Sequence, residues 1–249
     1  MIVPCFNEEE RFNVDYWNKL THKTSDIFWI FVNDGSTDQT LALLRALNGA
    51  NVRILNLDSN LGKSEAIRLG FINLIAEKND LDFVGYIDSD SAFEGSEVSL
   101  VLKGVSEYFR SDANLSAIFT SRVALAGRNI QRKSFRHYLG RMIITFITWS
   151  WATAPYDTQS GFKIYRVSQF LDTQLEQPFL TKWFIDIELL ARIGSLPRIK
   201  ILELPLNSWV DVSGSHIRIK DFPLIALDIF TARRVVKKNL KGGSNLGSH

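Results

Sequence analysis

The chain has 249 residues, 45% hydrophobic and 22% charged, which excludes a disordered, collagen-like or coiled-coil protein and fits one large domain or a domain plus an appendage. Its single cysteine, Cys5, excludes a disulfide framework and a cysteine-based zinc site and is typical of a reducing compartment. The net charge of +2 is the sum of an acidic N-terminal part, residues 1–100, and a basic C-terminal part, which includes a stretch without Asp or Glu at 113–156. This asymmetry predicts a metal site beside an anion-binding site.

Short β-branched runs alternate with helical patterns in the first half of the chain. We expect strands at 2–3 (ending at Pro4), 27–33, 52–57 and 83–87, and helices at 37–47, 63–78 and 96–109. This alternation predicts an α/β fold with a parallel sheet covered on both faces. Ligands of such sheets bind at the carboxyl ends of strands. Asn7, Glu8, Asp34, Asp88 and Asp90 all follow or end strands, so we expect them at one edge.

The second half is less regular. We expect strands at 117–120, 162–165 and 199–204, helices at 134–151 and 185–193, and a tail at 217–238 that is helical in two pieces broken before Pro223. Residues 242–249 are expected to be disordered. Trp149 and Trp151 are expected to pack in the interior rather than to anchor the protein at an interface.

Asp88-Ser89-Asp90 is the sharpest local motif. Two carboxylates at this spacing after a buried strand can face one hard cation, and Mg²⁺ or Mn²⁺ commonly shares its ligand shell with substrate phosphates. An isolated Asp-x-Asp is more often a polar turn, so the motif gains meaning only from its neighbours.

Two further loops carry candidate donor contacts. Asp34, at the start of the stretch DGSTD, could accept hydrogen bonds from a base or ribose, although turn and helix-cap chemistry explains the motif better when it is taken alone. Leu61-Gly62-Lys63 precedes a helix, where Lys63 and the helix N-terminus favour a phosphate. The full phosphate-loop pattern is missing, which argues against a P-loop NTPase.

Taken together, these motifs give the chain a family resemblance. VPCFNEE (3–9), VNDGSTD (32–38), NLGK (60–63) and DSD (88–90) occur in the order and spacing of the family 2 glycosyltransferases of GT-A fold. TSR (120–122), QRKSFR (131–136), DTQSGFK (157–163) and WFIDIELL (183–190) look like the dolichyl-phosphate glucosyltransferase branch, a close relative of the dolichol-phosphate mannosyltransferases. The resemblance covers residues 2–236.

The resemblance implies a GT-A fold, with a Rossmann-like, mostly parallel central sheet flanked by helices and with basic amphipathic helices at the C-terminal end. It implies an inverting, metal-dependent transfer of a sugar from a nucleotide-sugar to a polyprenyl or dolichyl monophosphate. The mannosyl relatives usually follow Asp-x-Asp with Leu-Gln, whereas this chain has Ser91-Ala92. We therefore favour UDP-glucose over GDP-mannose as the donor.

The resemblance also assigns roles by position. Donor contacts fall on Pro4, Asn7, Glu8, Asp34, Lys63, Asp88 and Ser89, and Asp88 and Asp90 would bind Mg²⁺ or Mn²⁺. Acceptor-phosphate contacts fall on Arg122, Arg132, Arg136 and Lys163, and the catalytic group comprises Asp90, Arg122 and Asp186. By the same resemblance, 1–211 is the glycosyltransferase domain, with a nucleotide-sugar and metal half at 1–112 and an acceptor half at 113–211.

Elementary chemistry leaves the acceptor open between two classes. A phosphate monoester has a second pKa of ~6, so it is largely ionised at neutral pH and needs positive charge more than a base. A hydroxyl on a glycan or lipid would need a general base, for which Asp186 is the candidate. Asp186 and Glu188 could also be solvated charges at a helix start. A non-catalytic nucleotide-sugar-binding protein is a third reading, which Asp88, Asp90 and Lys63 argue against.

Membrane contact is expected to be peripheral. The chain shows no signal peptide, and its longest strongly apolar stretch, 142–155, is shorter than the ~20 residues of a spanning helix. The tail at 212–241 is basic and amphipathic, which favours a helix lying on an anionic membrane surface at the cytoplasmic face. No nucleic-acid-binding motif accompanies these charges, so nucleic acid is not an expected partner.

Overall fold

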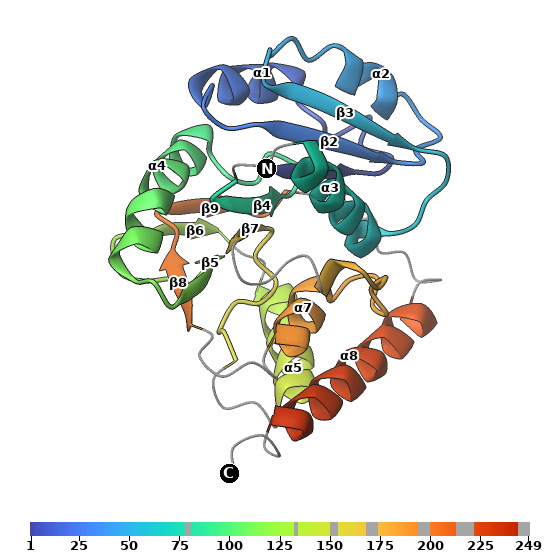
Figure 1. Cartoon of the computed structure of the whole chain (residues 1–249), viewed down its shortest axis with the longest axis vertical. Coiled ribbons are helices and arrows are strands. Elements are labelled where there is room, and N and C mark those ends of the chain that lie inside the picture. The colour runs from blue at the N-terminus through green and yellow to red at the C-terminus, as the bar shows by residue number, and fades with distance from the viewer. Residues whose placement is uncertain are drawn as a thin grey trace.

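A seven-stranded sheet forms the centre of the computed structural model, which describes residues 1–77, 81–131, 134–149, 154–167, 174–193, 200–212 and 222–243 (Figure 1). The strand order is β3-β2-β1-β4-β7-β5-β8. The strands are β1 (Ile2–Cys5), β2 (Trp29–Asp34), β3 (Val52–Leu57), β4 (Phe83–Ile87), β5 (Leu115–Ser121), β7 (Phe162–Arg166) and β8 (Lys200–Pro205). Only β7 runs antiparallel to its neighbours, β4 and β5, so the mostly parallel sheet is confirmed.

Helices cover both faces of the sheet. On one face lie α1 (Val14–Lys23), α2 (Thr40–Arg45) and α4 (Gly95–Ser111), and on the other lie α3 (Lys63–Glu77) and α7 (Ile185–Ile193). The first face buries Trp17, Leu44 and Val98 against Phe31, whereas the second buries Phe71 and other apolar side chains of α3. Two short strands, β6 (Asn129–Gln131) and β9 (Ser208–Val210), form a separate parallel pair.

Helix α1 is missing from the sequence predictions because little of it is apolar. Only Trp17 and Leu20, with the neighbouring Thr21, are buried on this ten-residue helix. Its N-terminus is capped by Asn13, whose side chain accepts a hydrogen bond from the backbone of Tyr16 at 2.9 Å. The indole of Trp17 then packs edge-on against other buried aromatic rings, which secures the helix to the sheet.

The first strand is longer than its sequence suggests. We expected it to end at Pro4, but β1 continues to Cys5 and pairs with β2 along its whole length. Pro4 is tolerated because β1 pairs with β4 only at Ile2, so no ladder bond on that side is required of the proline. Pro4 lies one residue before the strand end, close to the edge where Asn7 and Glu8 follow.

Two helices form a separate layer below the sheet. The helix α5 (Ser134–Thr148) and the long α8 (Phe222–Gly243) pack on α7 through a third core, in which Ile147, Ile187 and Val236 are buried (Figure 1). Asp228 of α8 accepts hydrogen bonds from the backbone of Lys182 and Trp183, both at 2.9 Å. Helix α8 begins at Phe222, with Pro223 in its first turn, where proline is compatible with a helix.

Several expectations fall outside the described residues. These are the first piece of the predicted tail helix, at 217–221, the end of the predicted helix at 150–151, which includes Trp151, and residues 244–249 of the expected disordered end. Within the part of the chain that the structure describes, no helix combines the length and the apolar character that crossing a bilayer requires.

Candidate active site

Polar side chains gather at the carboxyl edge of the sheet. Asn7 and Glu8 follow β1, Asp34 ends β2, Asp88 follows β4, and Arg122 follows β5. Because β7 is antiparallel, its beginning lies at the same edge, and the backbone N–H of Asp88 donates to the carbonyl of Gly161 at 2.8 Å. The edge therefore joins segments from both halves of the chain, as predicted for the first half.

The loops after β1 and β2 are held together by hydrogen bonds. Asn7 adopts a left-handed backbone conformation (φ 51°), and its side-chain oxygen accepts from the backbone of Thr37 at 2.9 Å. The backbone N–H groups of Asn7 and Glu8 donate to Ser36 Oγ and Thr40 Oγ1, at 3.0 and 2.7 Å. Asn7 thus shapes the loop beside Asp34 with its backbone and its side chain, and Glu8 does so with its backbone.

Asp34 positions the loop that leads to Lys63. Its buried carboxylate accepts hydrogen bonds from the backbone of Leu61 (2.8 Å) and Gly62 (2.9 Å) and from the Asn60 side chain (2.9 Å). Burial raises the pKa of Asp34, and the two backbone donors offset part of that effect. This role of Asp34 was not predicted from the sequence. The signal for it was the glycine at position 62, because the loop turns there with a φ of 93°, a conformation that favours glycine.

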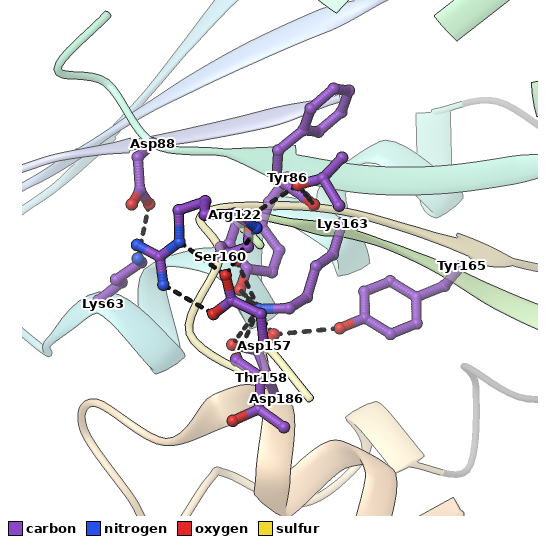
Figure 2. Close-up of polar contacts among 12 residues, drawn as sticks. Lys63, Tyr86, Asp88, Arg122, Asp157, Thr158, Ser160, Lys163, Tyr165 and Asp186 are labelled. Carbon is purple, nitrogen blue, oxygen red and sulfur yellow. Dashed lines mark hydrogen bonds and ion pairs between the residues drawn. The ribbon is translucent and has the colours of Figure 1, made fainter. Parts of the chain in front are cut away.

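Lys63 is the first residue of α3 and points back to the edge of the sheet. Its Nζ lies 2.6 Å from Asp88 Oδ1 and 5.6 Å from the ring centre of Tyr86 (Figure 2). Burial alone would lower the pKa of Lys63, but the charge and hydrogen bond of Asp88 outweigh it and the pKa is raised. The ammonium group therefore stays charged beside the Asp88 carboxylate.

The two carboxylates of the Asp-x-Asp motif repel each other. Burial and then the charge of Asp88 raise the pKa of Asp90 to about 6. Asp90 Oδ1 accepts a hydrogen bond from the backbone of Ala92 at 3.2 Å, and Ser91 between them is in the left-handed region (φ 58°). Ser89 is buried, and its carbonyl accepts a hydrogen bond from the Trp17 indole at 3.1 Å.

These two carboxylates fit a hard divalent cation that is completed by substrate. A cation would offset the burial of Asp90 and its repulsion by Asp88, the two effects that raise the pKa of Asp90. Within the described residues no group of three or more His, Cys, Asp or Glu side chains forms a metal site. Two protein carboxylates with substrate phosphate oxygens are a common arrangement for Mg²⁺ or Mn²⁺, so the residues present fit the predicted ion.

Arg122 is held in a fixed orientation next to these carboxylates. Its Nε and one terminal nitrogen each donate to Asp157 at 2.8 Å, and its backbone N–H donates to the same carboxylate at 2.9 Å (Figure 2). Burial alone would lower the pKa of Arg122, but Asp157 raises it, with a further contribution from Asp88. The guanidinium is therefore within electrostatic range of the Asp88 carboxylate.

The family model for glycosyl transferase family 2 matches residues 1–165, which is most of the chain. The chain belongs to glycosyltransferase family 2. It is therefore an enzyme that transfers sugar residues, and the family resemblance read from its motifs is confirmed.

The chain is similar to curated dolichyl-phosphate glucosyltransferases and to a solved glucosyltransferase structure. The glycosyltransferase is 26% identical over 238 residues to a dolichyl-phosphate beta-glucosyltransferase of Trichomonas vaginalis, covering 92% of this chain and 70% of the relative. It is 27% identical to the human dolichyl-phosphate beta-glucosyltransferase, covering 87% and 68%. Glucosyl-3-phosphoglycerate synthase of Mycobacterium tuberculosis, solved with Mg²⁺ and uridine diphosphate, has a TM-score of 0.63, 15% identity and coverage of 96% and 78%. This structural likeness confirms the GT-A fold.

In this glycosyltransferase, a buried ion pair lies beneath the carboxyl edge of the sheet. Lys163 is fully buried, and its Nζ lies 2.7 Å from Asp186 Oδ2. The other Asp186 oxygen accepts hydrogen bonds from the hydroxyls of Tyr86 (2.6 Å) and Tyr165 (3.2 Å). Burial lowers the pKa of Lys163, and the Asp186 carboxylate offsets part of that effect.

Lys163 also holds the loop that carries Asp157. Its Nζ donates to the carbonyls of Thr158 and Ser160 at 2.8 and 2.6 Å (Figure 2). From the other side, Glu203 of β8 accepts the backbone N–H of Asp157 at 2.8 Å. The loop from Asp157 to Gly161 is thus fixed at both ends, and it carries the partner of Arg122.

These contacts correct three sequence-based expectations. Asp186 is only 4% exposed and both of its oxygens are engaged, so it is not placed as a general base for a hydroxyl acceptor. Asp186 and Glu188 are also not solvated helix-start charges, because Glu188 is fully buried and accepts the backbone N–H of Thr181. Lys163 does not reach an acceptor phosphate, since its ammonium is enclosed by Asp186 and loop carbonyls.

The remaining predicted acceptor contacts keep their status as predictions. Arg132 lies outside the described residues, and Arg136 lies in α5 with a side chain that is also outside them.

Replacing Gly161 by alanine is expected to lower catalytic efficiency about a hundredfold, because displacing a catalytic group by about 1 Å can have that effect. A Cβ at this position would lie 2.0 Å from Asp88 Oδ2, so the carboxylate would have to move. The matched control is Gly140→Ala in α5, where a Cβ meets nothing within 4 Å. Equal rates of sugar transfer by the two variants would show that the position of Asp88 does not matter.

Proposed function

We propose that this glycosyltransferase moves glucose from UDP-glucose to a polyprenyl monophosphate of the dolichyl phosphate class, at the cytoplasmic surface of a membrane. The observation that carries the proposal is the position of Arg122, which Asp157 orients at the same edge as Lys63 and the Asp-x-Asp carboxylates. The similarity to dolichyl-phosphate beta-glucosyltransferases supports dolichyl phosphate as the acceptor and glucose as the sugar. The uridine nucleotides bound in structures of similar fold support the donor.

The donor would lie along the edge from β1 to β4. The loops of Asn7 and Asp34 would enclose the nucleoside, and Lys63 at the start of α3 would face the diphosphate. Asp88 and Asp90 would hold Mg²⁺ or Mn²⁺, which supplies positive charge to the diphosphate when bound. Lys63 adds a second positive charge where negative charge develops as the sugar leaves.

The acceptor phosphate would approach Arg122 from the other side of the sugar. One of its oxygens would form a bond to the anomeric carbon as the bond to the diphosphate breaks, which inverts the configuration there. A phosphate monoester with a second pKa of ~6 needs no base at neutral pH. It does need positive charge to come close to an anionic donor, and Arg122, held in place by Asp157, supplies that charge from the acid-free stretch of sequence at 113–156.

A hydroxyl acceptor is the competing possibility, and the burial of Asp186 disfavours it. The test compares a prenyl phosphate with the corresponding prenyl alcohol, using labelled UDP-glucose and counting label in each product. We expect transfer to the phosphate only. Transfer to the alcohol at a comparable rate would overturn the proposed acceptor class.

A variant of Arg122 provides the second arm of that test. Arg122→Gln should lower kcat/KM for the prenyl phosphate by about a hundredfold, since it removes a charge-assisted contact and leaves Asp157 without its bidentate partner. Binding of UDP-glucose should change much less, because the donor contacts lie on other strands. A variant with unchanged acceptor kinetics would remove Arg122 from the acceptor site.

A further inference from the structure

Helix α5 exposes a row of large apolar side chains. Tyr138, Met142, Phe146 and Trp149 are 66%, 67%, 40% and 78% exposed. Tyr138, Met142 and Phe146 are four residues apart and so lie on one side of the helix, and Trp149 follows one residue after the helix ends at Thr148. The expectation that Trp149 packs in the interior is therefore wrong, because the interior side of α5 is occupied by Ile144 and Ile147.

Helix α8 continues this surface. Leu224, Leu227 and Phe230, each three residues from the next, are 51%, 65% and 62% exposed. The rings of Phe230 and Phe146 meet edge to face with centres 6.0 Å apart, so the two rows touch. We call the seven side chains the α5–α8 apolar face; both helices lie in the lower part of Figure 1. Contiguous exposed apolar surface of this kind marks an interaction site.

Basic side chains lie next to this face. Along α8, the exposed row continues after Phe230 with Arg234, Lys237 and Lys238. Tyrosine and tryptophan beside lysine and arginine are typical of segments that lie at the boundary between water and lipid headgroups. A second copy of the chain would add its own basic row, whereas anionic headgroups complement the charge.

The face also borders a groove whose lining includes the residue before Asp157. Trp149 lines a groove of about 530 Å³, whose other wall includes Pro155 and Tyr156. The guanidinium of Arg141, on the same groove, lies 4.0 Å from the ring centre of Tyr156. Tyr156 is the residue next to Asp157, the partner of Arg122. The groove, which Glu203 also lines, thus ends one residue before the carboxylate that orients Arg122.

We propose that the α5–α8 apolar face rests on an anionic lipid bilayer, with its seven apolar side chains at the headgroup boundary and the basic row of α8 on the headgroups. The inference rests on the proposed function for the lipid nature of the acceptor. It goes beyond that function by assigning membrane contact to α5 and α8 together, rather than to the C-terminal tail alone.

Vesicle sedimentation without substrates tests this assignment. The probe is vesicles of phosphatidylcholine containing phosphatidylserine, and the test variant is Met142→Ser/Leu227→Ser, with one change on each helix. The matched control is Leu100→Ser on α4, where the leucine is 60% exposed and lies away from this face. We expect the double variant to lower the partition coefficient at least about tenfold, while the control binds like the wild type.

Two results would overturn the proposal: equal vesicle binding by the double variant and the wild type, or self-association in place of vesicle binding. Transfer of glucose to a short, water-soluble prenyl phosphate is measured on the same proteins. It should be the same in the double variant and the wild type, because neither substituted residue lies in the active site. Vesicle binding without any transfer would contradict the proposed function and leave the face standing, so the two failures can be told apart.

Discussion

Replacing Asp90 by asparagine is expected to lower kcat/KM for sugar transfer by about a thousandfold. Asp90 is one of two carboxylates that fit a divalent cation, and such an ion supplies several kcal/mol of charge stabilisation to a reaction of this kind. Each 1.36 kcal/mol corresponds to about a factor of ten in rate. The measurement is initial-rate kinetics with varied Mg²⁺ or Mn²⁺, and the apparent metal affinity should fall together with the rate.

The control for this change is Asp26→Asn, in an exposed turn before β2 that lies at the opposite edge of the sheet. Asp26→Asn makes the same chemical change far from the site and should leave the kinetics unaltered. Should Asp90→Asn retain full turnover with an unchanged metal requirement, the metal site does not lie at the Asp-x-Asp motif.

Replacing Lys163 by methionine is expected to lower the free energy of unfolding by about 3–5 kcal/mol, the usual effect of removing one partner of a buried ion pair. Lys163 is fully buried 2.7 Å from Asp186, so its loss leaves a buried carboxylate without its cation. It also releases the two loop carbonyls that it binds. Urea unfolding measures the change through the transition midpoint at constant slope.

The double variant Lys163→Met/Asp186→Asn separates the cost of leaving the Asp186 carboxylate unpaired from the cost of losing the packing of Lys163. Removing both charges should recover more than half of the lost stability, because no unpaired ion then remains. If Lys163 instead contacted the acceptor phosphate, Lys163→Met would fold with wild-type stability and would raise only the KM for the prenyl phosphate. That outcome would contradict the placement of Lys163 in the buried pair.

Much of the fold could be predicted from local patterns. Strands β3 and β4 and helix α7 occupy the residues that their apolar spacing predicted, and most other elements differ by a few residues at their ends. The direction of β7 could not be read in this way, because strand direction depends on pairing with segments far apart in the sequence. Helix α1 was missed because it buries only Trp17, Leu20 and Thr21, too few apolar residues to give a helical pattern.

The site could be predicted only in part, for a related reason. Asp34 and Asp88 were expected at one edge because each ends or follows a strand, and the structure places them there, together with Lys63. The role of Arg122 came from the family resemblance and not from its position at a strand end. The burial of Asp186 and Lys163 was not predictable, since it depends on the position of β7 between β4 and β5 and on the packing of α7 against the sheet. The ion pair between Asp157 and Arg122 likewise joins two segments whose proximity only the folded sheet creates.

The central claim is that one site joins a metal-bound nucleotide-sugar to a lipid phosphate. The most direct test incubates the protein with a short polyprenyl phosphate and labelled UDP-glucose, with labelled GDP-mannose in parallel, and counts label that enters the organic phase. We predict label from UDP-glucose alone, dependent on Mg²⁺ or Mn²⁺ and abolished by a chelator. No transfer from either donor despite measurable donor binding, or transfer that persists with the chelator, would contradict the claim.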